Sequence, residues 1–209
     1  MNAHEQERMW SSRFRDAGED YVFGTNPNRF LAAQLALLAS GANALSVADG
    51  EGRNAVWLAE QGLQVTATEI SPVALEKARK LAAGRHVEVD FVLADAVAWA
   101  YPEGAFDFVV AIFIQFATPA QRASIFAGMV RALKPGGHLI LQGYTPKQLE
   151  FRTGGPSAVD HLYTADMLRE AFGALEILHL QEYEDVLDEG VGHKGHSALV
   201  GLVARKPAA

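Results

Sequence analysis

The chain has 209 residues, of which 49% are hydrophobic and 21% are charged, which is the composition of a globular protein long enough to bury a full core. Its formal net charge is −7 and it has no cluster of Lys and Arg, which argues against a groove for a nucleic-acid backbone. The absence of Cys excludes disulfides, thiolate metal sites and Cys nucleophiles. The longest apolar run, Phe108 to Ile114, is too short to span a bilayer. We expect a single cytoplasmic domain over residues 1–209, a monomer or homodimer with no nucleic-acid partner, no membrane partner and no metal ion.

Two helices are predicted ahead of the first strand. Residues 4–14 have apolar side chains at helical spacing. Asn26 followed by Pro27 indicates an N-cap and the first turn of a second helix, which should end at Gly41. We interpret residues 1–40 as a helical lid segment, although its aromatic side chains could equally serve only to dock the first helix.

From residue 44 onward, strand-like and helix-like runs alternate. The predicted strands are 44–49, 64–69, 86–93, 106–114 and 138–142, and the predicted helices are 53–61, 72–83, 95–99, 119–133 and 164–172. Two long strand-like runs, 174–187 and 196–205, close the chain and indicate an antiparallel hairpin. The pattern predicts an α/β fold, Rossmann-like and doubly wound, whose mostly parallel seven-stranded sheet has one antiparallel C-terminal strand.

Residues 143–163 interrupt this alternation with a long connection rich in Gly and Pro. Connections of this length are usually functional or disordered. We expect this one to lie on the substrate side of the fold.

The loop from Ala48 to Gly52 follows the first predicted strand, and a helix begins directly after it. Glycines in such a loop let backbone N–H groups approach a ligand at the positive end of the helix. Glu69 ends the next strand, about 17 residues later, at the spacing of the carboxylate that holds ribose hydroxyls in nucleotide-binding α/β folds. The sequence therefore predicts a site for a nucleotide-like cofactor.

These motifs, in their order and spacing, resemble the class I S-adenosylmethionine (SAM)-dependent methyltransferases over nearly the whole chain. The family's first loop is usually G-x-G-x-G, and the break at residues 134–137, Lys-Pro-Gly-Gly, is similar to the family's turn before strand five. Within the class, Gly52-Arg53-Asn54 and Glu184-Asp185-Val186, ahead of a His-bearing hairpin, resemble the small tellurite-resistance-type methyltransferases. A dinucleotide site for hydride transfer would have G-x-G-x-x-G, and Gly is absent at positions 48 and 53.

The resemblance implies SAM as the cofactor. The residues expected to bind it are Arg13, Tyr21, Ala48, Asp49, Gly50, Gly52, Asn54, Glu69, Ile70, Asp95, Ala96 and Ile112. Glu69 would accept both ribose hydroxyls, Ile70 would pack on the adenine and Asp95 would contact the adenine amino group, although an Asp after a strand also serves as a helix N-cap.

The sequence departs from the family pattern at two positions in the first loop region. Ser46 stands where an acidic residue is usual, so the family's contact to the amino-acid end of the cofactor need not form there. Ala48 replaces the first Gly, which should be tolerated unless this residue requires a positive φ.

On the acceptor side, the candidate catalytic residues are His193, Tyr144 and Arg152. Imidazole titrates near neutral pH and suits a general base, although a His in a Gly-rich turn is usually only exposed. The function implied is methyl transfer to a small-molecule acceptor. A non-catalytic SAM-binding sensor or partner protein is the alternative, and an NAD-dependent oxidoreductase is disfavoured by the loop spacing.

Overall fold

The computed structural model describes residues 2–208, which divide into two compact units, one formed by residues 2–99 with 189–192 and the other by residues 100–188 with 193–208. Seven strands form a sheet in the order β3-β2-β1-β4-β5-β7-β6. The strands are β1 (Asn43–Ser46), β2 (Gln64–Glu69), β3 (Asp90–Leu93), β4 (Phe106–Ile112), β5 (Leu133–Tyr144), β6 (Glu176–Asp188) and β7 (Lys194–Arg205). Every observed pairing that includes β7 is antiparallel and the others are parallel, which confirms the predicted fold class.

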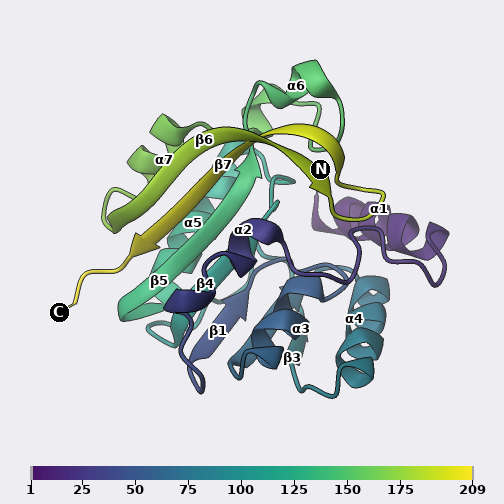
Figure 1. The fold of residues 1–209 in the computed structure, drawn as a ribbon, viewed down its shortest axis with the longest axis horizontal. Helices are drawn as coiled ribbons and strands as arrows, with labels where there is room; N and C mark the ends of the chain where they lie inside the picture. The colour runs from purple at the N-terminus through teal and green to yellow at the C-terminus, as the bar shows by residue number, and fades with distance from the viewer. Residues whose placement is uncertain (1, 209) are drawn as a thin grey trace. The chain divides into compact units, whose positions relative to one another are not determined.

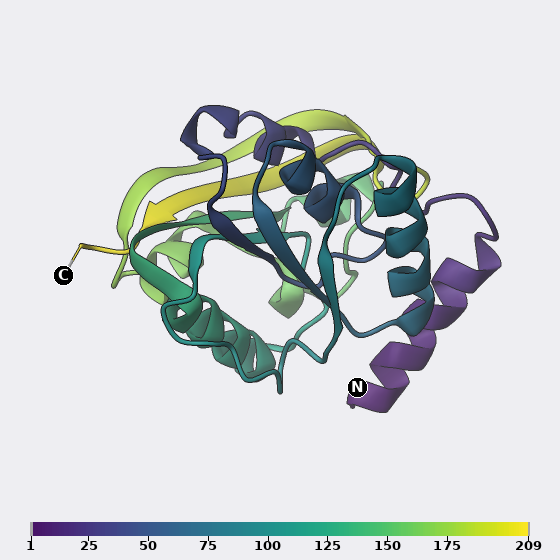
Figure 2. The same cartoon turned by 90° about the horizontal axis from the view of Figure 1, so that it is seen from below.

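The first unit holds β1, β2 and β3, which pair in parallel. Its helices are α1 (Ala3–Asp16), α2 (Arg29–Ala32), the 3-10 helix η1 (Leu35–Leu37), α3 (Arg53–Glu60) and α4 (Pro72–Gly84). Helix α1 lies beside α4, where the hydroxyls of Ser11 and Ser71 are 2.8 Å apart (Figure 2). The N-terminal helix is thus packed against the helix that follows β2.

The second unit holds β4 to β7, and Figure 1 shows β5, β7 and β6 running side by side. Its helices are α5 (Pro119–Ala132), α6 (Gln148–Phe151), the 3-10 helix η2 (Val159–His161) and α7 (Ala165–Ala171). Helices α6 and η2 lie within the long connection 143–163. Strand β4 is buried, with Val109, Val110 and Ala111 all at 0% exposure, as expected for a near-continuous apolar run.

Local start signals predicted several helices correctly. Ser71 caps α4, with Pro72 as its first residue, and Thr164 caps α7. Thr118 and Gln121 form the predicted capping box at the start of α5. These signals depend only on residues within one turn of each other, so they can be read without the tertiary structure.

The predicted helix from residue 26 to residue 41 is wrong. Only α2 and η1 form there, and the N-cap of α2 is Asn28 rather than Asn26. The Asn28 side-chain oxygen accepts from the Leu31 N–H at 3.0 Å, while its amide nitrogen donates to Glu189, 161 residues away. A tertiary contact therefore selects which Asn begins the helix.

Four predicted strand boundaries and one predicted helix are also wrong. Strand β4 ends at Ile112 because Phe113 has φ 57°, and β1 ends at Ser46, ahead of Ala48 with φ 49°. Strand β3 begins only at Asp90, and no helix forms at 95–99. Strand β5 begins at Leu133 rather than at 138, and it passes through the glycine-containing break.

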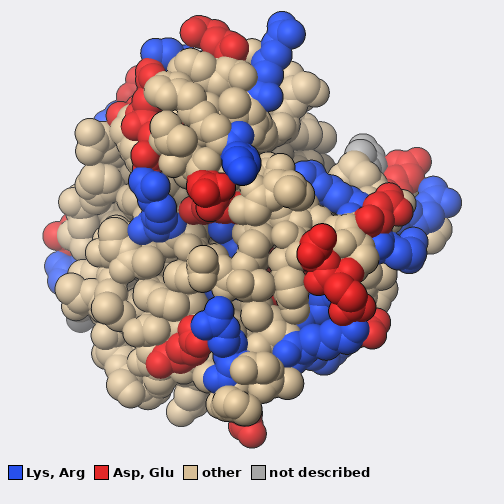
Figure 3. Space-filling model, turned by 45° about the vertical axis from the view of Figure 1, so that its right-hand side comes forward, with Lys and Arg blue, Asp and Glu red and all other residues tan. Residues whose placement is uncertain are grey.

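Charged side chains of both signs are distributed over the surface. On the face drawn in Figure 3, acidic and basic residues are interspersed rather than gathered into blocks of one sign. Within residues 2–208, no helix combines the length and apolar character needed to cross a membrane.

Candidate active-site residues

The two glycines in the loop between β1 and α3 differ in how closely neighbouring atoms surround them. Gly52 has φ 92°, and a Cβ there would lie 2.8 Å from the Ala78 Cβ on α4, so only glycine lets the two helices approach. Gly50 has φ 66°, and a Cβ there would meet only the Phe14 ring edge, at 3.7 Å. The loop is therefore packed tightly at its helix end and less tightly at Gly50, where the nearest neighbour is the edge of the Phe14 ring.

Glu69 lies at the carboxyl end of β2 and is buried, with 5% of its surface exposed. Its two carboxylate oxygens accept from the N–H of Gly50 at 3.0 Å and the N–H of Ser71 at 2.9 Å. Burial raises the pKa of Glu69, and these backbone donors oppose that rise. A carboxylate has about four acceptor positions, so a ligand can still donate to Glu69 while these two bonds hold it in place.

Asp49 lies within the loop and is bonded to Ser46, whose hydroxyl donates to Oδ1 at 2.5 Å. The second oxygen, Oδ2, is buried and has no hydrogen-bond partner among the described residues. Burial raises the pKa of Asp49 to about 7, while the Ser46 hydroxyl, the Ala55 N–H and the Arg53 charge act in the opposite direction. Asp49 is therefore a buried acid whose charged form lacks solvation.

Asp95 and Ala96 follow β3, which pairs with β2 so that Glu69 lies opposite Leu93. The pairing brings Glu69 and Asp95 to the same edge of the sheet. Asp95 Oδ1 accepts from the Val97 N–H at 2.9 Å, so the structure gives this residue the capping role, here in a turn rather than a helix. Ala96 is buried and Ile70 is half-buried. The predicted adenine contacts of these residues stay predictions.

Asn54 and Arg53 belong to a buried polar cluster whose other members were not predicted. Asn54 Oδ1 accepts from the Asn28 N–H at 2.9 Å. Arg53 forms an ion pair with Glu189 at 2.8 Å, and Glu189 also accepts from the Asn28 amide at 3.0 Å. The motif Gly-Arg-Asn thus anchors the segment ahead of α2 and the turn at 189–192, in addition to any contact that Asn54 makes with a cofactor.

Glu51, the remaining loop side chain, anchors the N-terminal segment. One of its oxygens accepts from the Val22 N–H at 2.7 Å, and the other pairs with Lys77 at 2.6 Å, in a pair whose side chains are only 2% and 9% exposed. Tyr21 donates its hydroxyl to the Lys77 carbonyl oxygen at 3.0 Å. No sequence signal marked Glu51 or Lys77, because their partners lie 26 or more residues away.

Arg13 and Tyr21, the two lid residues expected to bind cofactor, have internal contacts in the structure. The Arg13 guanidinium lies 5.4 Å from the Trp10 ring centre and 5.1 Å from that of Phe23. Phe14, Val22 and Ala74 form the buried centre of this aromatic cluster. The predicted cofactor contacts of both residues stay predictions beside this packing role.

The second unit brings two of the three predicted catalytic residues together. Phe113 stacks on Tyr144 with ring centres 4.7 Å apart, and the His193 ring lies 4.3 Å from Phe113 and 5.8 Å from Tyr144. Phe113 follows Ile112 at the end of β4 with φ 57°, an outlier for a bulky residue. Strain of this kind gathers at functional sites, so this cluster is the candidate acceptor-side site.

Arg152 is not brought into this aromatic cluster by any hydrogen bond or ring contact between described residues. It is exposed and closes α6 in the left-handed conformation, with φ 55°. Its predicted catalytic role therefore rests on the sequence alone.

Gln115, which follows the strained turn after β4, is committed to internal hydrogen bonds. Its amide accepts from the Tyr144 N–H at 2.5 Å and donates to the Tyr144 carbonyl at 2.9 Å and the His161 carbonyl at 3.1 Å. The Gln115 side chain thus bonds both the N–H and the carbonyl of the last residue of β5, as the backbone of a neighbouring strand would. Gln115 supports Tyr144 rather than contributing chemistry of its own.

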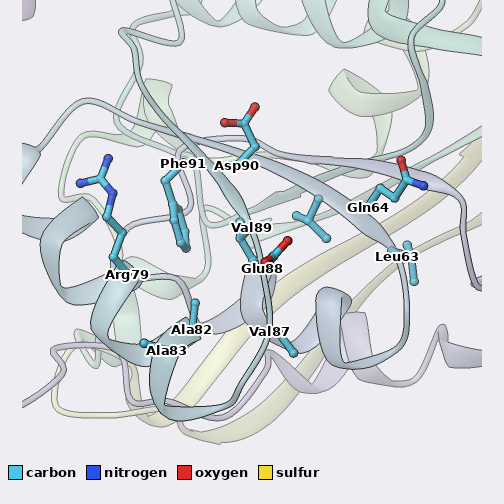
Figure 4. Close-up of a pocket in the computed structure, with 11 residues that line it drawn as sticks. Leu63, Gln64, Arg79, Ala82, Ala83, Val87, Glu88, Val89, Asp90 and Phe91 are labelled. Carbon is cyan, nitrogen blue, oxygen red and sulfur yellow. The ribbon is translucent and has the colours of Figure 1, made fainter.

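A groove of about 740 Å³ lies elsewhere in the first unit (Figure 4). Its wall includes Gln64 and Asp90, the first residues of β2 and β3. Ligands of open α/β sheets bind at the carboxyl ends of the strands, where Glu69 lies. The groove is therefore not the candidate cofactor site. Among the described residues, no group of three or more His, Asp or Glu side chains is arranged to hold a metal ion.

Comparison with known proteins agrees with this geometry. The family described as a methyltransferase domain matches residues 44–137. The demethylmenaquinone methyltransferase of Thermus thermophilus is 36% identical over 117 residues, which cover 55% of this chain and 53% of that protein. The chain spans about half the length of the curated relatives it matches.

Solved structures share the fold at low identity. TehB from Haemophilus influenzae has a TM-score of 0.71 at 19% identity, covering 94% of this chain and 67% of that chain. The N-methyltransferase NodS from Bradyrhizobium japonicum, in complex with S-adenosyl-L-homocysteine, has a TM-score of 0.70 at 16% identity, covering 95% of this chain and 98% of that chain. These comparisons show that residues 44–137 are similar to a methyltransferase domain and that the chain shares its fold with TehB and the N-methyltransferase NodS.

Proposed function

We propose that this protein transfers a methyl group from SAM to a small-molecule acceptor. The observation that carries the proposal is Glu69, a buried carboxylate at the end of β2 fixed by the N–H groups of Gly50 and Ser71. This arrangement leaves acceptor capacity for a pair of ribose hydroxyls beside the loop at Gly50. The residues present therefore fit the cofactor.

When bound, SAM supplies an electrophilic methyl group that passes in line to a nucleophile. The task of the chain is then to orient the cofactor and to align the acceptor, which can supply much of the acceleration. Glu69 orients the ribose, and the loop backbone holds the neighbouring end of the cofactor. The packed segment around Tyr21 and Phe23 serves as a cover that limits access of water.

We further propose a planar, aromatic acceptor. The aromatic cluster of Phe113, Tyr144 and His193 supports this choice, because such rings stack on one another. The name of the Thermus relative, a demethylmenaquinone methyltransferase, points to the same class of compound. His193 is then the residue that takes a proton from the acceptor during transfer.

The first experiment measures SAM binding by calorimetry. Replacing Glu69 with Gln removes the charge from the hydrogen bonds to ribose and should weaken SAM binding by about 1–3 kcal/mol, or about 5- to 150-fold. The matched control is Glu76→Gln on α4, because the Glu76 side chain is 73% exposed. Equal affinity in the wild type and Glu69→Gln would show that the ribose assignment is wrong, and a wild type that binds no SAM would refute the proposed function.

The second experiment measures transfer of labelled methyl groups to a panel of hydroxylated aromatic compounds, thiols, amines and tellurite. His193→Asn should lower kcat at unchanged SAM affinity. His196→Asn, three residues later in the chain, should not, because His196 is exposed and hydrogen-bonded to Glu184 at 2.7 Å. SAM binding without formation of S-adenosylhomocysteine for any acceptor would favour the alternative, a SAM-binding sensor or partner protein.

A further inference from the structure

The Tyr144 ring of the aromatic cluster is closed off from solvent in this structure. Tyr144 is 1% exposed and His193 is 8% exposed, whereas Phe113 is half-buried. An acceptor cannot stack on a ring that it does not reach. Part of the chain therefore has to move before Tyr144 can contact an acceptor.

Gly155, in the long connection after β5, lies directly against the Tyr144 ring, and both residues belong to the second unit. A Cβ at position 155 would be 2.7 Å from Cδ2 of Tyr144, while Gly155 itself is exposed. At this position a single glycine separates the ring from solvent. The chain turns sharply here, since φ is 55° at Arg152, 149° at Gly154 and 81° at Gly155.

The turn formed by residues 152–156 is attached to the rest of the unit through Thr153. The Thr153 hydroxyl donates to the His196 carbonyl on β7 at 2.5 Å and accepts from the Gln148 amide at 3.0 Å. Gly155 forms no hydrogen bond with another residue of the described range 2–208. Segments with few such bonds open locally at low cost, so the 152–156 turn can open once the Thr153 bonds break.

We propose that the ring of the acceptor takes the place beside Tyr144 that Gly155 now fills, and that the 152–156 turn moves aside to admit it. This inference rests on the proposed function, because it says where the planar acceptor of that reaction stacks. A stacked ring would replace the contact with Tyr144 that Gly155 gives up. The closed turn then weakens acceptor binding by the fraction of time for which the site is open.

The test measures how fast tetranitromethane nitrates Tyr144 in the full chain, read by mass spectrometry of peptides, with no acceptor present. Thr153→Val removes both hydrogen bonds of the hydroxyl and should raise the nitration rate of Tyr144 by about 5- to 30-fold. Thr153→Ser keeps the hydroxyl and should stay within about twofold of the wild type. Tyr101, which is buried elsewhere in the same unit, is the internal control and should not change.

A second variant, Gly155→Ala, opens the turn without touching Thr153. The new Cβ would meet the Tyr144 ring, so the turn should shift outward and nitration of Tyr144 should rise by at least about tenfold. Gly136→Ala is the matched control, because Gly136 has φ 80° and nothing lies within 4 Å of a Cβ there. No rise at Tyr144 in either variant, or an equal rise at Tyr101, would overturn the inference.

Methyl-transfer kinetics separate this inference from the proposed function. Thr153→Val should raise kcat/KM for the acceptor by the same factor as the nitration rate, at unchanged SAM affinity, because the turn is open more often. Faster nitration without a higher kcat/KM would overturn the inference and leave the proposed function intact. A wild type that binds no SAM would refute the proposed function, and the acceptor role of the turn with it.

Discussion

The buried pair of Glu51 and Lys77 gives the sharpest stability prediction. Its atoms are 2.6 Å apart, and the side chains are 2% and 9% exposed. Lys77 also donates to the Asp20 carbonyl at 2.5 Å. Replacing Lys77 with Met leaves the Glu51 charge buried and unpaired, which should cost about 3–5 kcal/mol of the free energy of unfolding. For a chain of this length, a loss of 3 kcal/mol lowers Tm by about 6–12 °C.

The assay is urea unfolding of a double-mutant cycle made of Lys77→Met, Glu51→Gln and the double variant. The double variant should lose less than the sum of the single losses, with a coupling of at least about 1 kcal/mol, because it leaves no unpaired charge. Lys80→Met is the matched control, since Lys80 is on the same helix, is 57% exposed and should change stability by less than about 0.5 kcal/mol. Additive single losses, or a Lys77→Met loss below about 1 kcal/mol, would refute the reasoning.

Three further results are expected from the loop. Ala48→Gly should raise the free energy of unfolding by about 0.5–1 kcal/mol in urea, because φ 49° strains any residue with a Cβ. Gly52→Ala should lower the free energy of unfolding by about 2–4 kcal/mol, because its Cβ would lie 2.8 Å from the Ala78 Cβ. Gly41→Ala is the control and should lower it by only about 1–2 kcal/mol, because nothing lies within 4 Å of a Cβ there. Equal losses for the two variants would contradict the packing argument. Burial raises the pKa of Asp49 from 3.8 to about 7, so the folded state holds a proton that the unfolded chain releases. The stability of the cofactor-free protein should therefore fall by up to about 4 kcal/mol as the pH rises from about 4 to about 7, and Asp49→Asn should flatten that curve in urea titrations across this range.

The parts of the fold that could be predicted are those set by neighbouring residues. Ser71-Pro72 and the Thr118 capping box begin helices because their hydrogen bonds join residues within one helical turn. Glu69 could be placed because parallel strands bring their carboxyl ends to one edge, whatever the rest of the chain does.

The parts that could not be predicted depend on contacts between distant residues or on strained backbone. Asn28 displaces Asn26 as a cap because Glu189 lies beside it, and no local pattern links positions 161 residues apart. Phe113 takes φ 57° against the preference of its residue type, so an apolar run could not show where β4 ends. Asp95 caps a turn by accepting from the Val97 N–H, but no helix follows that turn.

The role of Glu51 has a consequence for how the chain can be shortened. Alignment with the methyltransferase domain family covers residues 44–137, and a designer looking for a minimal catalytic fragment would start there. Such a fragment would lack Val22 and Asp20, whose backbone groups solvate the pair formed by Glu51 and Lys77. Water would have to take over that solvation beneath the loop between β1 and α3. The segment that holds Asp20 and Val22 is thus packed against the loop, and a purification tag belongs ahead of this segment rather than in its place.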